Sequence, residues 1–211
     1  PHNVLISVLQ LKTQDKKYFE ALSKKRITAI AFDYIKDEHD VYPIVRSLSE
    51  IAGTASMHIA AELMTSDNGG NGLLLGNISG VPPTEVVILG AGTVGEYAAK
   101  AAVGLGANIR VFDNSITKLR NLQRYIKTPI YTSTVQPKNL LKALMRANIV
   151  IGAIRGKERS PVVVTETMIQ RMKNGAVIVD ISIDCGGCFE TSKVTTHSQP
   201  IFREHGVIHY C

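Results

Sequence analysis

The stretch Gly90-Ala-Gly92-Thr-Val-Gly95 constrains the fold of this chain more than any other feature. It follows the apolar run VVIL and opens a segment of helical character, TVGEYAAKAAVGLG. In such a strand–turn–helix unit the first glycine permits a tight turn and the second lets a pyrophosphate approach the backbone. The third lets the helix and strand pack closely. The free N–H groups and positive dipole of the helix N-terminus favour phosphates. The motif therefore predicts a dinucleotide-binding turn.

An acidic residue stands where such a turn needs one. The next apolar run, NIRVFD, ends in Asp113, eighteen positions after Gly95. A carboxylate there accepts hydrogen bonds from both hydroxyls of the adenosine ribose and repels a 2′-phosphate, which favours NAD over NADP. Lys118 is the nearby cation that would soften this preference. The alternative is that Asp113 only caps the helix that follows it.

Strands and helices alternate regularly from residue 85 onward. Apolar runs rich in Val and Ile are typical of strands buried on both faces, and alternation with helices is typical of a parallel sheet. The predicted strands are 86–89, 109–112, 130–133, 149–154, 176–181 and 207–210, and the predicted helices are 93–105, 116–125, 137–146 and 165–173. The sequence thus predicts an α/β fold with a Rossmann-type, doubly wound parallel sheet.

The part before this alternation reads as a remnant of a second α/β domain. Residues 4–9 and 27–31, the latter running on to 35, are predicted strands, and residues 16–24 a helix between them. Ser47-Leu-Ser-Glu50 has the spacing of a capping box, which predicts a helix over 48–64 that ends in the turn-rich SDNGGNG. The expected organisation is a remnant of a substrate domain (1–42), a connector (43–72) and a nucleotide-binding domain (73–211).

Composition excludes several other classes of protein. A chain of 211 residues with 45% apolar content buries one full core. The net charge of +6 comes from short, separate basic runs, which does not predict nucleic-acid binding. No apolar run reaches the roughly 18 residues that a membrane span needs. Three cysteines and no basic leader argue against a secreted disulfide framework, so we expect a cytoplasmic protein.

Two segments follow later strands of the predicted sheet, where ligands of such sheets bind. Gly152-Ala-Ile154 places small residues at a strand end, either to let a nicotinamide ribose lie close or for tight packing alone, and the basic loop RGKERSP follows. In the segment DISIDCGGC, Asp180 reads as a structural hydrogen-bonding residue. Asp184 lies where the nicotinamide end is expected, and there it would orient the substrate or assist proton transfer.

The pair Cys185-Gly-Gly-Cys188 has the spacing of a redox or metal pair. A zinc site needs two further ligands, for which His197 and Cys211 are the only obvious candidates. We favour cysteines that happen to lie in a glycine turn, with no bound metal. His197, within TTHSQP, reads as a loop or capping residue.

Taken together, these motifs resemble alanine dehydrogenase. The resemblance rests on Ser49-Glu-Ile-Ala-Gly53, NGGNGLLLGNISGVPP, GAGTVG, VFDNSITKL, VIVDISIDCGG and TTHSQPIF…HGVIHY, and it covers essentially the whole chain. It implies reversible NAD-linked oxidative deamination of L-alanine to pyruvate and ammonia. The related alpha subunit of nicotinamide nucleotide transhydrogenase shares the fold. It is the first rival interpretation, and a non-catalytic NAD-sensing module is the second.

The resemblance assigns roles to individual residues. It implies that Ser49, Gly90, Gly92, Thr93, Val94 and Gly95 contact the phosphates, and that Asp113 and Val135 flank the adenosine. Ile154 and Ile181 would flank the nicotinamide, and Asp184 would lie at the catalytic centre. Cys185 stands where the family often has glutamine.

The same resemblance implies a homo-oligomer whose substrate-binding arginine, lysine and histidine lie upstream of this chain. We therefore expect the cofactor half of an active site, inactive alone, in which Asp184 supports a base from elsewhere.

Overall fold

The structure is a computed structural model that describes residues 3–9, 11, 14–156 and 159–211. The chain divides into two compact units, Pro1–Ser49 and Glu50–Cys211, and the division falls inside helix α2 (Pro43–Leu63). The expected domain limits at residues 42 and 72 stay a prediction. The two units are described separately below.

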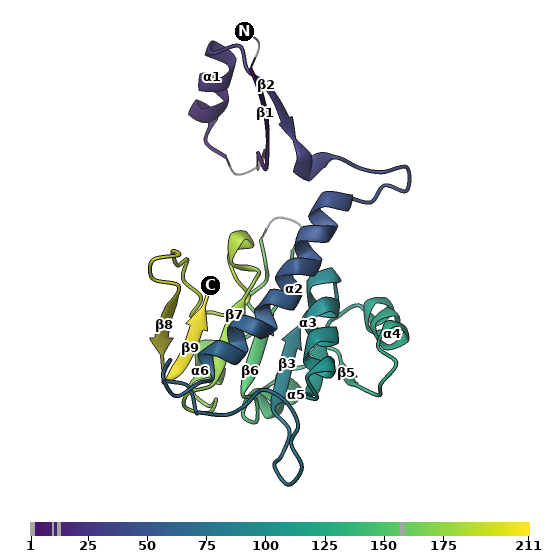
Figure 1. Ribbon diagram of the computed structural model, residues 1–211, viewed down its shortest axis with the longest axis vertical. Coiled ribbons are helices and arrows are strands. Elements are labelled where there is room, and N and C mark those ends of the chain that lie inside the picture. Colours follow the sequence, from purple (N-terminus) through teal and green to yellow (C-terminus); the bar gives the residue numbers. More distant parts are fainter. Residues whose placement is uncertain (1–2, 10, 12–13, 157–158) are drawn as a thin grey trace. The chain divides into compact units, whose positions relative to one another are not determined.

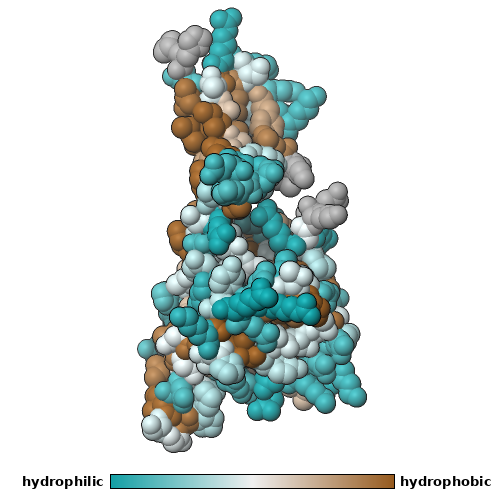
Figure 2. Space-filling view, turned by 90° about the vertical axis from the view of Figure 1, so that its right-hand side faces the viewer, coloured by the Kyte–Doolittle hydropathy of each residue, from teal (hydrophilic) through white to brown (hydrophobic). Residues whose placement is uncertain are grey.

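The first unit is a small strand–helix–strand arrangement. β1 (Val4–Ser7) pairs in parallel with β2 (Thr28–Ala31), and α1 (Lys16–Lys24) forms the crossover that a parallel pair requires. Much of its apolar surface is exposed, including Val4 at 60% and Ile6 at 62%. The space-filling view shows apolar side chains gathered over this unit (Figure 2). Leu9 is the buried apolar residue in the described part of this unit, so the unit holds little core of its own.

The chain after β2 differs from the prediction. The strand expected to run on to residue 35 ends at Ala31, and a 3₁₀ helix, η1 (Phe32–Tyr34), follows. A carboxylate oxygen of Asp33 in this turn accepts a hydrogen bond from the Leu9 N–H at 3.3 Å. A polar side chain that satisfies a distant backbone group here takes the place of further strand pairing.

The start of α2 also differs from the prediction, which placed it at residue 48. The helix begins at Pro43, so Ser47-Leu-Ser-Glu50 lies inside it and is not a capping box. The Ser47 hydroxyl donates instead to the Pro43 carbonyl at 3.1 Å, one turn back. Proline suits the first helical position because its φ is already helical and its missing N–H would have no partner there.

The second unit is built on a seven-stranded sheet in the order β5-β4-β3-β6-β7-β9-β8 (Figure 1). All neighbours are parallel except β8 and β9. The strands are β3 (Glu85–Leu89), β4 (Asn108–Phe112), β5 (Tyr131–Ser133), β6 (Ile149–Gly152), β7 (Val177–Asp180), β8 (Ile201–Glu204) and β9 (Val207–Tyr210). The chain runs outward from β3 to β5 and then returns to place β6 on the other side of β3. This is the strand order of a doubly wound sheet, and its switch point lies between β3 and β6.

Helices cover both faces of this sheet. One buried layer contains side chains of α2, α3 and α4, and the other contains side chains of α5 and α6. Alternate residues of each central strand enter opposite layers, as with Ile88 and Leu89 of β3. The helices are α3 (Thr93–Gly104), α4 (Ile116–Tyr125), α5 (Pro137–Leu144) and α6 (Glu166–Ile169). The predicted α/β fold is confirmed for this unit.

The edge beyond β7 holds the main addition to the prediction. β8 was not predicted, and it pairs antiparallel with β9 through the two-residue turn His205-Gly206. Both turn residues have positive φ, 51° and 76°, which matches the turn that joins twisted hairpin strands. The helix predicted over 165–173 is shorter, because α6 ends at Ile169.

Candidate nucleotide-binding site

The glycine turn joins β3 to α3 at the carboxyl end of β3, beside the switch point of the sheet. Gly90 has φ +108°, and a Cβ there would lie 2.4 Å from the Ala153 carbonyl oxygen. A Cβ at Gly95 would fall within 1.8 Å of the Gly90 carbonyl oxygen, so α3 approaches β3 closely. A Cβ at Gly92 would meet nothing within 4 Å. Gly90 and Gly95 are thus required by the backbone, and Gly92, the second glycine of the motif, faces open space.

Gly92 is also the N-cap of α3, and Thr93 and Val94 form the first turn of the helix. The first N–H groups of a helix have no partner within it, and they carry the positive end of its dipole. Open space above Gly92 and N–H groups behind it form a cradle that fits a pyrophosphate.

Asp113 follows β4 and lies beside this turn. Its Oδ2 accepts a hydrogen bond from the Ala91 N–H at 2.8 Å, and its Oδ1 accepts one from the Ser115 N–H at 2.7 Å. The N-cap of α4 is Ser115, whose hydroxyl accepts from the Lys118 N–H at 3.4 Å. Asp113 therefore does more than cap a helix: it joins the glycine turn to the start of α4, with lone pairs remaining for a ligand.

The other residues expected at a cofactor lie on several elements. Val135 is half-buried after β5, and its N–H donates to the Asn114 Oδ1 at 3.1 Å. Ile154 and Ile181 follow β6 and β7 and pack half-buried against opposite layers of the core. The carboxyl ends of parallel strands share one edge of a sheet, so these residues and the glycine turn border the same edge.

For two of the residues expected at the cofactor, Ser49 and Lys118, only the surroundings within their own helices are described. The Ser49 hydroxyl donates to the Val45 carbonyl at 2.8 Å within α2, and Ser49 is the last residue of the first unit. Lys118 is exposed on α4. The basic loop RGKERSP is described in part, because Lys157 and Glu158 lie outside the described residues.

Gly152 is explained by packing. A Cβ there would lie 2.7 Å from an Asp180 carboxylate oxygen and from Phe189, and 2.8 Å from the Cys188 sulfur. Protein atoms already crowd this position, so packing alone explains why residue 152 is a glycine.

Asp180 anchors the segment after β7. This carboxylate is 2% exposed and accepts hydrogen bonds from the Ser182 N–H at 3.0 Å and from the Ser182 hydroxyl at 2.5 Å. It also accepts from the Cys188 N–H at 3.0 Å and the Ser192 hydroxyl at 2.6 Å. A buried carboxylate with this many donors is satisfied without a cation. The expected structural role of Asp180 matches these contacts.

Asp184 lies at the tip of that anchored segment. It occupies the short 3₁₀ helix η2 (Ile183–Cys185), after the carboxyl end of β7, and its side chain is exposed. Gly186 ends η2 in the left-handed conformation, with φ 96°. Asp184 is therefore presented to the same edge of the sheet as the glycine turn.

The two cysteines of this segment differ in environment. Cys188 is fully buried, and its Sγ lies 3.8 Å from the Asp180 Oδ1. Burial, followed by the negative charge of Asp180, raises the pKa of the Cys188 thiol far above its usual value. A thiol held in its neutral form is a poor nucleophile and a poor metal ligand. Within the described residues, Cys185, Cys188 and Cys211 are free, and no group of three or more His, Cys, Asp or Glu side chains is placed to hold a metal.

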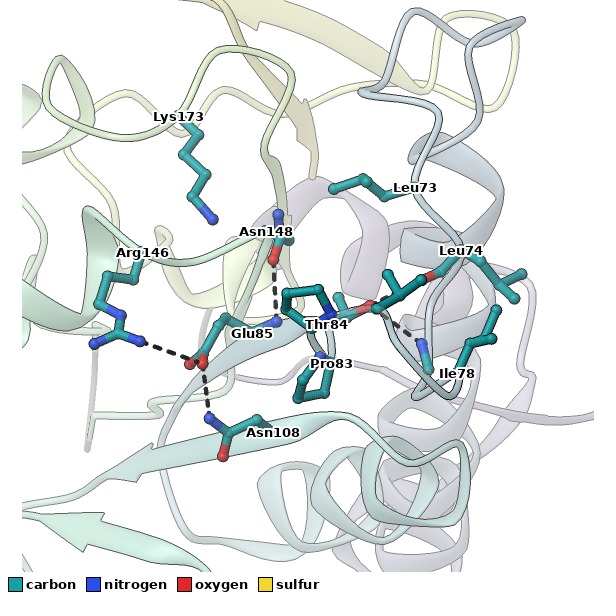
Figure 3. A pocket seen from close by; sticks show the side chains of 13 residues that line it. Leu73, Leu74, Ile78, Pro83, Thr84, Glu85, Asn108, Arg146, Asn148 and Lys173 are labelled. Carbon is teal, nitrogen blue, oxygen red and sulfur yellow. Dashed lines mark hydrogen bonds and ion pairs between the residues drawn. The ribbon is translucent and has the colours of Figure 1, made fainter.

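A hollow of about 630 Å³ lies at the opposite, amino-terminal edge of the sheet (Figure 3). Its polar wall includes Glu85, whose carboxylate accepts from the Asn108 amide at 2.7 Å and pairs with Arg146 at 3.8 Å. None of the candidate catalytic or cofactor-binding residues predicted from the sequence lines this hollow. Because Glu85 begins β3 and Gly90 follows it, the hollow and the glycine turn lie at opposite ends of one strand.

The fold and the site together define the class of domain to which the second unit belongs. The doubly wound strand order and the glycine turn at its switch point are those of a Rossmann-type nucleotide-binding domain. Residues 56–211 match the family model described as "Alanine dehydrogenase/PNT, C-terminal domain". The chain belongs to this family.

Individual relatives agree with the family match. The chain is 39% identical over 209 residues, 98% of its length, to alanine dehydrogenase 2 of Staphylococcus aureus strain USA300, and it spans 56% of that relative. A solved L-alanine dehydrogenase matches 99% of the chain at 35% identity with a TM-score of 0.92, over 58% of that structure. The transhydrogenase from Sinorhizobium meliloti matches 98% of the chain with a TM-score of 0.79 over 59% of that structure. Its identity is 20%, so it shows the shared fold alone. Among the described residues, no helix combines the length and apolar character needed to cross a membrane.

Proposed function

We propose that this chain is the NAD-binding region of an alanine dehydrogenase, which converts L-alanine reversibly to pyruvate and ammonia. The observation that carries the proposal is the placement of Asp113 beside a glycine turn whose second glycine faces open space. The 39% identity to an alanine dehydrogenase over nearly the whole chain supports the choice of reaction.

Different residues of the chain would bind different parts of the cofactor. The N–H groups of residues 92–95, at the start of α3, would bind the pyrophosphate, and Asp113 would accept from the ribose hydroxyls. The assignment of Ser49 to the phosphates stays a prediction from the family resemblance. Val135 would contact the adenine, and Ile154 and Ile181 would exclude water from the nicotinamide. NAD supplies the hydride acceptor of the reaction when bound.

Asp184 is the residue proposed to touch the reacting groups. Its exposed carboxylate follows the carboxyl end of β7, at the same edge of the sheet as the glycine turn. β7 lies two strands from β3 in the sheet. There it would orient the substrate amine or hold a proton during hydride transfer. We also propose that the whole protein is a cytoplasmic homo-oligomer, as the family resemblance implies.

Two measurements test the proposal. Calorimetric titration of this chain is expected to show saturable binding of NADH. Binding of NADPH is expected to be much weaker. The full protein, as its gene encodes it, is expected to produce NADH from alanine and NAD. Absence of NADH binding would remove the cofactor assignment. Alanine turnover that survives Asp184→Asn unchanged would remove the role of Asp184 and favour a non-catalytic use of the site.

A further inference from the structure

The loop after β6 rests on the turn that carries Asp184. A Cβ built on Gly186 would lie 2.6 Å from the Arg159 Nε, 2.9 Å from its Cγ and 3.2 Å from its Cδ. The alkyl stem of Arg159 therefore lies directly against the Gly186 backbone. The next residue, Ser160, donates its N–H to the Cys185 carbonyl at 2.8 Å. Two adjacent residues of one loop thus contact the two residues that follow Asp184.

These contacts reach the part of the turn that lies between its two side-chain anchors. Asp180 holds the base of the turn through Ser182 and Cys188. Between those two anchors, the tip is closed by its own backbone hydrogen bonds, such as Gly186 N–H to the Ile183 carbonyl at 2.8 Å. The contacts of Arg159 and Ser160 are the ones described that reach the tip from another loop.

We propose that Arg159 is a positioning residue for Asp184: its stem packs on Gly186 and fixes the tip of the turn from which Asp184 projects. This inference rests on the proposed role of Asp184 in alanine turnover. Glycine is required at position 186 both for its positive φ and because any side chain would displace the arginine stem. Arg159 itself is exposed, so its effect on catalysis passes through the turn.

The test uses the full protein and three substitutions that separate the stem from the charge. Arg159→Ala removes both, Arg159→Met keeps an apolar stem, and Arg159→Lys keeps stem and charge. We expect Arg159→Ala to lower kcat on the order of 10- to 100-fold, because small misplacements of a catalytic group cost that much. Arg159→Met and Arg159→Lys should stay close to the wild type, and the Kd for NADH should stay the same in all three.

A double-mutant cycle distinguishes positioning from general loosening. If Arg159 acts through Asp184, then Arg159→Ala has no further effect on kcat in an Asp184→Asn background. Arg171→Ala, an exposed arginine after α6, is the matched control and should leave kcat unchanged.

The outcomes separate this inference from the proposed function. A full protein without alanine turnover contradicts the proposed function. With turnover present, an unchanged kcat in Arg159→Ala, or an additive loss with Asp184→Asn, overturns the positioning role. Loss in Arg159→Met with retention in Arg159→Lys overturns it in favour of a charge that meets an anionic ligand.

Discussion

At the scale of single residues, the carboxylate of Asp113 has two functions in one place. Its bonds to the Ala91 and Ser115 N–H groups hold the glycine turn and the start of α4 in fixed positions. Its remaining lone pairs are proposed to accept from a ribose. The turn is thereby shaped before a ligand arrives, which lowers the ordering cost of binding.

Asp113→Ala is therefore expected to weaken NADH binding by roughly 10- to 100-fold, since two charge-assisted hydrogen bonds and the ribose acceptor are lost. The ratio of NADH to NADPH affinity should fall as well, because no negative charge then faces a 2′-phosphate. Fluorescence titration with both nucleotides measures this. Asp67→Asn, an exposed acid in the turn after α2, is the control. Equal NADH affinity in Asp113→Ala and the wild type would contradict the role of Asp113.

The sequence predicted this residue but not its surroundings. The spacing of Asp113 from the glycine motif is a local signal, which is why it was visible. The contact of Arg159 with Gly186 joins residues 27 positions apart through two loops, and no periodicity or motif encodes such a contact. Gly152 shows the converse. Its small size has two explanations in the sequence, and the crowding by Asp180, Phe189 and Cys188 that explains it comes from residues distant along the chain.

At the scale of elements, the prediction succeeded where the pattern repeats and failed at ends. The buried strands β3, β4 and β6 and the helices between them follow from apolar runs and period. β8 lies outside the predicted strands, although His205-Gly206 is a hairpin signal, because only the apolar run after this turn predicts a strand. Ser47 to Glu50 have the spacing of a capping box, but α2 already begins at Pro43. The four residues therefore lie inside the helix, where they cannot cap its start.

The β8–β9 hairpin carries a titratable group that makes its stability depend on pH. His209 is fully buried, stacks on Phe202 at 4.8 Å, and shares a 2.8 Å hydrogen bond between its Nε2 and the Thr191 hydroxyl. Its Nδ1 lies 3.2 Å from the Val207 carbonyl, which fits a ring that donates from Nδ1 and accepts at Nε2. Burial lowers the pKa of His209, against smaller raising effects of the Val207 carbonyl and Glu204.

A lowered pKa in the folded state means that the unfolded chain binds the proton more readily. The stabilisation is therefore complete above the unfolded pKa of about 6.5 and is lost as the pH falls toward the folded pKa. Urea unfolding at pH 7.5 and 5.5 should show lower stability at pH 5.5, with a contribution of at most about 1.4 kcal/mol per pH unit from this histidine. His209→Gln should reduce that difference, whereas His39→Gln, at an exposed site, should keep it. An equal pH dependence in His209→Gln would contradict the assignment.

At the scale of the whole molecule, the two units differ in how much core they hold. Both buried layers of the sheet are built from residues 57–208, within the second unit. The first unit contributes Leu9 alone to the buried apolar residues that the structure describes. The glycine turn, Asp113, the anchor Asp180 and Asp184 all belong to the second unit. Stability and nucleotide binding are thus expected to reside together in that unit.

A chain of residues 43–211, which keeps α2 entire and Ser49 with it, is therefore expected to fold and to bind NADH within about threefold of the full 211 residues, a difference of less than 1 kcal/mol. Fluorescence titration of both chains measures the affinity, and circular dichroism checks that the shorter one is folded. Asp113→Ala should lower the affinity by the same factor in either chain, because distant sites contribute additively. A folded shorter chain that binds NADH more than tenfold weaker would show instead that residues before Pro43 form part of the nucleotide site.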